Sequence, residues 1–314
     1  MGIPFLADYL MYLRKSRGLA GSTIGTYLAS ISSVWSRTSS TVVSKSPELT
    51  AMLKSFRLED HTRRFRPPAW DLNTVLQHLT SDVFEPLSEV DLLHLTQKTV
   101  FLLAMATAAR VSELHAIDVT RITFDRGPKG FAHLALLWSF VAKNQSMDQE
   151  GRSFHIPPLR NIVGPHDRED LSLCPVRALR YYLHRTKILR KGRRRLFIPT
   201  STDVTTEVGK NRMSFWIRST ILDAYKAAGR PPPTSAKAHE TRALASSFAL
   251  HSNVALTDIL KGCFWRGDTT FANYYLRDLA VADVEGVHSF GPLVLAQQVE
   301  FTLVLYLDTY ITVC

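Results

Sequence analysis

The chain has 314 residues, 45% of them hydrophobic, and its 38 lysines and arginines against 28 acidic residues give a formal net charge of +10. This length suits two domains with a packed core. The longest apolar run without a charged residue, residues 100–109, is too short to span a bilayer, so no membrane partner is expected. The three scattered cysteines support neither a disulfide framework nor a zinc site. The positive excess points towards a polyanion, with nucleic acid as the first candidate and a basic solvated surface as the alternative.

The first sixty residues predict a small helical module. Apolar residues recur at helical spacing in residues 5–13, and again in residues 24–35 after an expected N-cap at Ser22. A third short helix is expected at residues 47–58. The basic, proline-containing stretch HTRRFRPPAW then suits an extended linker. The predicted divisions are residues 1–60, a linker at 61–71, a larger domain at 72–290 and a tail of unclear structure at 291–314.

The larger domain is predicted to be mainly helical with a small antiparallel sheet. An apolar-rich helix is expected at residues 92–109, running directly into Arg110. Over residues 121–156, β-branched and aromatic residues alternate with polar ones, which predicts two or three antiparallel strands with Lys143 at a hairpin edge. Pro175 opens the next helix at a favoured first-turn position. Further helices are expected at residues 72–79, 212–228, 240–251, 255–261 and 269–276.

Three side chains in this domain suit an anion-binding site. Arg110, in AARVSELH, would ordinarily reach the surface or pair with an acid such as Glu113, but its rigid fork can also grip two phosphate oxygens. His239 and Arg242, in AHETRA, are three residues apart at a helix start, so both lie on one face, where the helix N-terminus favours an anion. The alternative for this pair is a capping histidine and a surface arginine.

Four more residues extend this set. Lys143 would ordinarily be a solvated turn residue, but an ammonium group can protonate a leaving 5′-oxygen. Trp265 has an indole N–H that can hold a phosphate oxygen, although packing is the ordinary role of a tryptophan and of the nearby Tyr274 and Tyr275. Arginines, lysine, histidine and tyrosine are together the side chains needed to break a phosphodiester bond without a metal. The sequence has no nucleotide-binding loop, nucleophile elbow or metal-ligand cluster, so no metal or cofactor is expected.

Two basic clusters are candidate DNA contacts. One precedes a Pro-Pro pair, and the other is the run TKILRKGRRR, in which every charged residue is basic. Such runs neutralise DNA phosphates, but they also occur as nuclear-import signals. The candidate contact residues are Arg63, Arg64, Arg66, Lys191, Arg193, Arg194 and Arg195.

Taken together, these segments resemble the tyrosine recombinases, the family of phage integrases, and most closely the recombinases of DIRS-type retrotransposons. The likeness runs from about residue 3 to residue 280. It rests on successive segments in the family's order: RGLAGSTIGTYLASI, PPAWDL, QKTVFLLAMATAARVSEL, SFVAK, LCPVRALRYYL, HETR and WRGDTTFANYYL. Many relatives carry Gly-His where this chain has Phe264–Trp265. The resemblance implies a helical core-binding, DNA-binding domain at residues 1–60 and a mixed α/β catalytic domain at residues 72–290.

The resemblance also implies a function, which is DNA cleavage and rejoining through a 3′-phosphotyrosine intermediate in site-specific recombination of a mobile element. Tyr275 is expected as the nucleophile because TFANYY fits the DIRS-type pattern, while Tyr274 fits the phage-integrase spacing and stays an alternative. The implied partners are double-stranded DNA and three further copies of the chain in a homotetramer on two DNA sites, with a nuclear location if the element is eukaryotic. The other implied catalytic residues are Arg110, Lys143, His239, Arg242 and Trp265.

Two alternative functions remain open at this point. One is a catalytically inactive DNA-binding derivative of a recombinase, which keeps the DNA contacts without the chemistry. The other is a DNA-relaxing enzyme like the type IB topoisomerases, which uses the same chemistry without a partner site. Nicking of supercoiled DNA separates the first alternative from an active enzyme.

Overall fold

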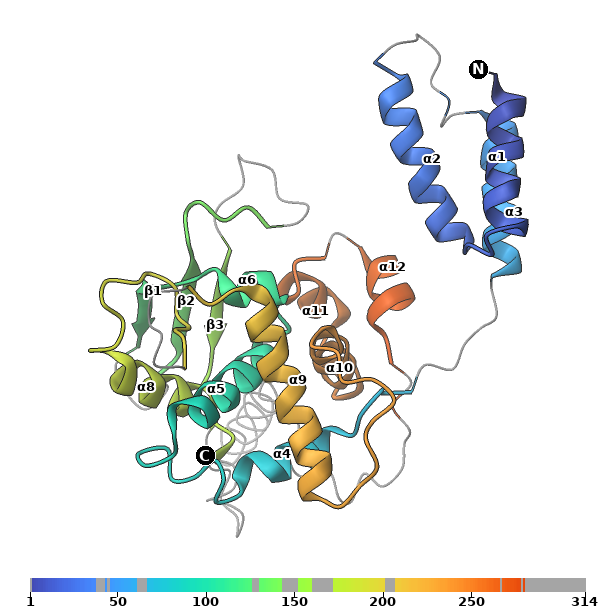
Figure 1. Cartoon of the computed structure of the whole chain (residues 1–314). Helices are drawn as coiled ribbons and strands as arrows, with labels where there is room; N and C mark the ends of the chain where they lie inside the picture. Colours follow the sequence, from blue (N-terminus) through green and yellow to red (C-terminus); the bar gives the residue numbers. More distant parts are fainter. Residues whose placement is uncertain are drawn as a thin grey trace, which may run out of the picture. The chain divides into compact units, whose positions relative to one another are not determined.

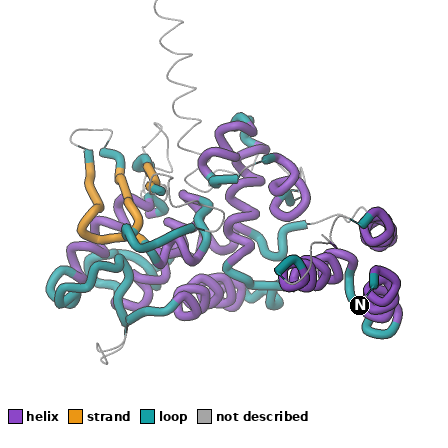
Figure 2. The backbone as a smooth tube through the Cα atoms, turned by 90° about the horizontal axis from the view of Figure 1, so that it is seen from above, coloured by secondary structure: helices purple, strands orange, loops and turns teal. Residues whose placement is uncertain are grey.

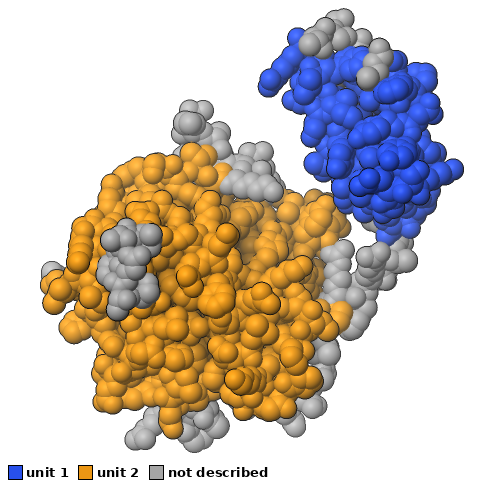
Figure 3. All heavy atoms as spheres, viewed as in Figure 1, with its two compact units in different colours: residues 1–65 blue, residues 66–314 orange. Residues whose placement is uncertain are grey.

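The computed structural model describes residues 2–37, 43, 46–60, 67–125, 130–142, 152–159, 172–200, 207–265, 267–277 and 279. The chain divides into two compact units, Met1–Phe65 and Arg66–Cys314 (Figure 3). The division falls inside the expected linker, of which residues 61–66 lie outside the described part, as does the expected tail at 291–314. Among the described residues, no helix has the length and apolar character needed to cross a membrane.

The first unit is a three-helix module whose apolar faces meet in one core. Its buried residues include Leu10, Ile24 and Leu49, one from each helix. The second helix begins at Gly21, before the expected cap at Ser22, and a Cβ at Gly21 would lie only 2.9 Å from the Cβ of Phe56. Glycine therefore lets these two helices approach closely. The three helices are α1 (Ile3–Lys15), α2 (Gly21–Trp35) and α3 (Pro47–Glu59).

The second unit is built around one helix that is buried on all sides. This helix, α5 (Leu92–Thr107), is buried at every position from Leu95 to Thr107, because its apolar residues do not keep to one stripe. It packs against α8, α9 and α10, and Figure 1 shows α9 crossing in front of it. The surrounding helices are α4 (Leu72–Thr80), α8 (Pro175–Thr186), α9 (Lys210–Ala227) and α10 (His239–His251).

A three-stranded antiparallel sheet lies at one side of this helical body (Figures 1 and 2). The strands β1 (Ile117–Phe124), β2 (Ala132–Leu136) and β3 (Ser153–Ile156) pair in chain order. The prediction of a mainly helical fold with a small antiparallel sheet is thus confirmed. The first strand starts at Ile117 rather than at the expected residue 121, and its register against β2 shifts between Ile117 and Ile122.

Most of the expected helices are confirmed to within two residues at each end, but the expected continuation of one helix into Arg110 and the single helix expected at 269–276 were wrong. Helix α5 ends at Thr107 rather than 109, because Ala108 adopts a left-handed conformation (φ 47°). Arg110 therefore caps the next helix, α6 (Val111–His115), instead of ending α5. The segment expected as a helix at 269–276 is a short α12 (Asp268–Thr270) followed by a π-helical turn, η2 (Phe271–Tyr275), and both come after α11 (Leu256–Gly262).

Candidate functional site

A buried carboxylate lies at the centre of the site. Glu113 is fully buried, and its Oε1 accepts hydrogen bonds from Nη1 of Arg110 at 3.0 Å and from Nη1 of Arg152 at 2.6 Å. Its Oε2 accepts from the backbone N–H of Arg110 at 2.7 Å and lies 3.7 Å from Nη1 of Arg242. Three positive charges against one negative charge leave a formal charge of +2, which favours binding of an anion.

The side chain of Arg242 is fixed by hydrogen bonds to backbone carbonyl groups. Its two Nη atoms donate to the carbonyl oxygens of Ala108 and Cys263, at the ends of α5 and α11. The left-handed turn at Ala108 thus provides an acceptor for the arginine. The Nε–H of Arg242 is buried and has no acceptor among the described residues. Burial lowers the pKa of this guanidinium, so its charge is poorly solvated without an anion.

Three rings stack beside the arginines. The ring centroid of Tyr275 lies 4.5 Å from that of Trp265 and 5.1 Å from that of His239. The Cζ of Arg242 lies 4.6 Å from the Trp265 ring centroid, a cation–π contact. The indole N–H of Trp265 is buried and, within the described part of the chain, has no acceptor. Burial, followed by the charge of Arg242, lowers the pKa of His239, which favours the neutral imidazole.

The two adjacent tyrosines differ in position. Tyr275 is 8% exposed and lies in the ring stack, whereas Tyr274 is 65% exposed. Two contacts with α10 fix the segment: Ser247 Oγ donates to the carbonyl of Tyr275 at 3.2 Å, and Arg277 forms an ion pair with Glu240 at 2.9 Å. The π-helical turn places Tyr275, and not Tyr274, beside His239.

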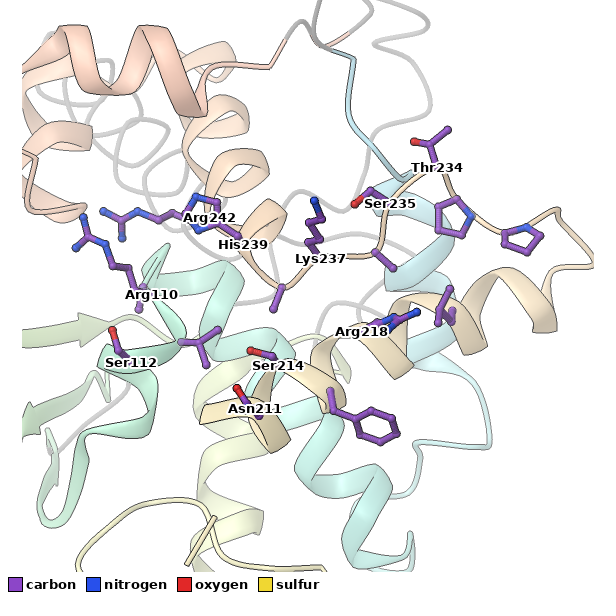
Figure 4. Close-up of a pocket in the computed structure, with 18 residues that line it drawn as sticks. Arg110, Ser112, Asn211, Ser214, Arg218, Thr234, Ser235, Lys237, His239 and Arg242 are labelled. Atoms are coloured by element: carbon purple, nitrogen blue, oxygen red, sulfur yellow. The ribbon is translucent and has the colours of Figure 1, made fainter. Parts of the chain in front are cut away.

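A groove of about 1030 Å³ opens from this cluster. Figure 4 shows Arg110, His239 and Arg242 gathered at one end, with Thr234 and Arg218 towards the other. None of the described residues that line the groove is acidic. Its polar lining residues are Arg110, Ser112, Asn211, Ser214, Arg218, Thr234, Ser235, Lys237, His239 and Arg242.

The structure thus brings together Arg110, His239, Arg242, Trp265 and Tyr275. The remaining predicted catalytic residue, Lys143, lies outside the described residues, as do the candidate DNA contacts Arg63, Arg64 and Arg66. Arg110 forms the ion pair with Glu113 that was expected for an ordinary structural arginine. It also lines the groove. Arg242 is buried, so the interpretation as a surface arginine was wrong.

The basic run after α8 does not line the groove. Arg194 forms an ion pair with the buried Asp118, and Nε of Arg195 lies 3.2 Å from a carboxylate oxygen of Glu207. Lys191 is exposed and Arg193 is half-buried. Part of this run therefore stabilises the sheet region internally, whatever its contribution to DNA binding.

Sequence reasoning missed two residues of the site. Arg152 precedes β3 and meets Glu113 across 39 residues of chain, a separation that no local pattern reveals. Phe264 lies against Arg152, with the guanidinium Cζ 4.5 Å from its ring centroid. The departure from Gly-His at Phe264–Trp265 was the signal that could have drawn attention to this pair.

No protein-family model matches the chain, and no curated protein matches its sequence. The fold is nevertheless similar to solved structures. A lambda integrase (75–356) dimer bound to a COC′ core site is 15% identical with a TM-score of 0.50, over 92% of this chain and 83% of that chain. The XerH site-specific recombinase bound to difH substrate is 11% identical with a TM-score of 0.43, over 66% of this chain and 50% of that chain.

The similarity at a TM-score of 0.50 defines the fold class. The second unit has the fold of tyrosine recombinase catalytic domains, with a mainly helical body and a small antiparallel sheet.

Proposed function

We propose that the chain cleaves and rejoins DNA strands through a 3′-phosphotyrosine intermediate. The observation that carries this proposal is a pair of buried donors, Nε–H of Arg242 and Nε1–H of Trp265, which lack acceptors among the described residues and lie beside the ring of Tyr275. Leaving a buried donor unsatisfied costs about 1–3 kcal/mol. A DNA phosphate would supply the missing acceptors, and its negative charge suits the formal charge of +2 around Glu113.

In this mechanism the phenol oxygen of Tyr275 attacks the scissile phosphorus. A bond forms between that oxygen and phosphorus, and the bond from phosphorus to the 5′-oxygen breaks. His239 takes the phenol proton, which it can do because its lowered pKa keeps it neutral. Lys143 gives a proton to the departing 5′-oxygen. Attack by a 5′-hydroxyl on the phosphotyrosine reverses these steps and rejoins a strand, without a metal or another cofactor.

The two arginines that line the groove stabilise charge in this reaction. Arg110 and Arg242 would contact the non-bridging phosphate oxygens, on which negative charge builds in the pentacoordinate transition state. Trp265 would donate its N–H to one of the same oxygens. Because these groups are already fixed by Glu113 and by backbone carbonyls, little reorganisation is needed when DNA binds.

Tyr275 is the proposed nucleophile, and Tyr274 is the alternative. The burial of Tyr275 in the ring stack and its centroid distance of 5.1 Å from His239 support this choice. Tyr274 is exposed and would have to turn inward to reach the arginines. The pattern TFANYY supports the same choice from sequence.

The wider proposal is site-specific recombination or integration of a mobile element of the DIRS type. The fold similarity to a lambda integrase dimer bound to DNA supports double-stranded DNA as the partner and more than one protomer at a site. The acid-free groove beside the cluster supports contact with a phosphate backbone. A homotetramer on two DNA sites and action in the nucleus complete the proposal, and both rest on the sequence resemblance.

Trapping of a covalent adduct tests the proposed chemistry. Duplexes bound by the protein would be selected from a random-sequence library and rebuilt with a nick close to each candidate cleavage position, so that the short fragment bearing the released 5′-hydroxyl is lost after cleavage. We expect a denaturation-resistant protein–DNA adduct with the wild type and none with Tyr275→Phe. Retained binding of the selected duplexes without any adduct from the wild type would favour the inactive DNA-binding derivative. Relaxation of supercoiled plasmid lacking the selected site would favour the topoisomerase-like alternative.

A further inference from the structure

Arg152 is a third arginine at the site, and its side chain is nearly buried. Its side chain is 10% exposed, and its Nη1 lies 2.6 Å from Oε1 of Glu113. That oxygen also accepts from Nη1 of Arg110 at 3.0 Å, so the two arginines share one carboxylate oxygen. Burial lowers the pKa of Arg152, and the Glu113 carboxylate acts in the opposite direction.

The face of the Arg152 guanidinium is covered by Phe264, at 4.5 Å from Cζ to the ring centroid. Phe264 itself packs edge-on against Phe154 of β3, with ring centroids 5.9 Å apart. Arg152 is therefore fixed on two sides, by a carboxylate and by an aromatic face. A planar guanidinium suits both contacts, since it can donate in its plane and stack on its face.

The backbone of Phe264 shows that this contact is maintained against strain. Its φ is 53°, in the left-handed region that glycine adopts freely and a bulky side chain does not. The position directly follows the C-cap of α11, where the N–H of Trp265 donates to the carbonyl of Leu260 at 2.8 Å, and such helix ends favour glycine. The ring gives this position a contact that glycine could not make.

The charge balance indicates what Arg152 contributes. Arg110 and Arg242 with Glu113 alone would sum to a formal charge of +1, because the carboxylate would offset one arginine. With Arg152 the sum is +2. A phosphodiester carries one negative charge, and the pentacoordinate transition state carries two. Arg152 thus adds the charge that matches the transition state rather than the ground state.

We propose that Arg152, held by Phe264, is a positioning residue that shares Glu113 and so keeps Arg110 available to the phosphate. This inference rests on the proposed function. Nη1 of Arg152 donates to the buried Glu113, the same carboxylate that binds Arg110, so Arg152 acts through Glu113 and Arg110. Its removal should slow the cleavage step while leaving DNA affinity nearly unchanged.

Single-turnover cleavage of the selected nicked duplexes tests this role, with DNA affinity and thermal unfolding measured in parallel. Arg152→Gln is expected to slow cleavage by about tenfold or more with the Kd for DNA changed by less than about twofold. Arg152→Lys keeps the charge and should recover part of the rate. The matched control is Arg180→Gln, because Arg180 also stacks on a phenylalanine, with Cζ 4.0 Å from the Phe124 ring centroid, but it belongs to α8 and does not line the groove.

Phe264→Gly separates positioning from general stability. Glycine removes the strain, so the melting temperature should stay equal or rise, while cleavage slows because Arg152 loses its aromatic cover. Wild-type cleavage rates in Phe264→Gly, or equal loss of rate and DNA affinity in Arg152→Gln, would overturn the proposal. So would an Arg152→Lys variant as slow as Arg152→Gln.

A binding measurement that does not depend on cleavage separates the test of Arg152 from the test of the proposed function. Inorganic phosphate binding to the DNA-free protein would be measured by calorimetry for the wild type and Arg152→Gln. We expect the variant to bind phosphate several-fold more weakly, because HPO4²⁻ carries two negative charges as the transition state does, whereas a DNA phosphodiester carries one. Absence of any adduct from the wild type would contradict the proposed function, whereas phosphate binding that is no tighter in the wild type than in Arg152→Gln would contradict the role of Arg152.

Discussion

The ring of Tyr275 stacks on that of Trp265, with centroids 4.5 Å apart and planes inclined by 42°. The stack holds the proposed nucleophile beside an indole N–H that has no acceptor in the described part of the chain. Arg242 lies against both rings, with Cζ 4.6 Å from the Trp265 centroid and 5.4 Å from that of Tyr275. One tryptophan therefore positions a tyrosine, covers an arginine and offers a donor to a bound phosphate.

Trp265→Phe separates the donor from the packing. Phenylalanine keeps most of the stacking surface but removes the N–H, so we expect cleavage to slow by about tenfold to a hundredfold. The free energy of unfolding should change by less than about 1 kcal/mol, because the lost donor has no partner in the DNA-free protein. Single-turnover kinetics and urea unfolding measure the two effects. An unchanged cleavage rate would contradict a phosphate contact by the indole.

The lowered pKa of His239 predicts the pH dependence of cleavage. The neutral ring accepts the Tyr275 proton, so at subsaturating DNA the acid limb of the rate profile should lie below pH 6.5, where the rate falls as the pH drops through the lowered pKa. In unfolding, the denatured state binds this proton first, so stability is lost as the pH falls from 6.5 towards the lowered pKa. The pH–rate profiles of the wild type and His239→Gln test this assignment, and an acid limb centred above 6.5 would oppose it.

The groove predicts a salt-dependent contact at Arg218. This exposed arginine of α9 lines the groove together with Asn211 and Ser214. Replacing it with glutamine should weaken DNA binding and reduce the slope of log Kd against log salt by about one, because one phosphate contact is lost. Fluorescence anisotropy at several salt concentrations gives the slope, with Arg180→Gln as the control. Identical slopes for wild type and Arg218→Gln would contradict a DNA contact in this part of the groove.

The close approach of α2 and α3 predicts opposite effects at two glycines of the first unit. Gly21→Ala would place a Cβ 2.9 Å from Cβ of Phe56 and 3.0 Å from the backbone of Arg57, so we expect a loss of about 1–3 kcal/mol. Gly25→Ala meets only the flexible end of Arg57 at 3.2 Å and should be neutral or stabilising by up to about 1 kcal/mol. Thermal unfolding of the full chain compares them, and equal melting temperatures would contradict the predicted packing.

The helices were predictable where periodicity and capping agree. Pro175 begins α8 as its first-turn preference indicates, and the apolar spacing of α1 and α2 matches their buried faces. The end of α5 was not predictable, because an alanine, Ala108, adopts the left-handed conformation that glycine or asparagine usually marks. That turn provides a carbonyl acceptor for Arg242. This tertiary contact accompanies a backbone conformation that the residue type alone does not favour.

The candidate site was predictable only for residues that lie in recognisable segments. Arg110, His239 and Arg242 were expected together, and the structure brings them to one groove. Arg152 was not predicted, because its role depends on Glu113 and on a contact with Phe264 across the fold. The pairing of Arg194 with Asp118 could not be predicted by counting charges, because that contact requires tertiary structure.

In the proposed mechanism Tyr275 becomes covalently linked to DNA. The most direct measurement is mass spectrometry of the peptide that stays attached to DNA after the wild type reacts with a selected nicked duplex, is denatured and is digested with protease. We predict a nucleotide attached to Tyr275 through its 3′-phosphate. A link on Tyr274 would contradict the choice of nucleophile, and a link to any other residue would contradict the proposed chemistry itself.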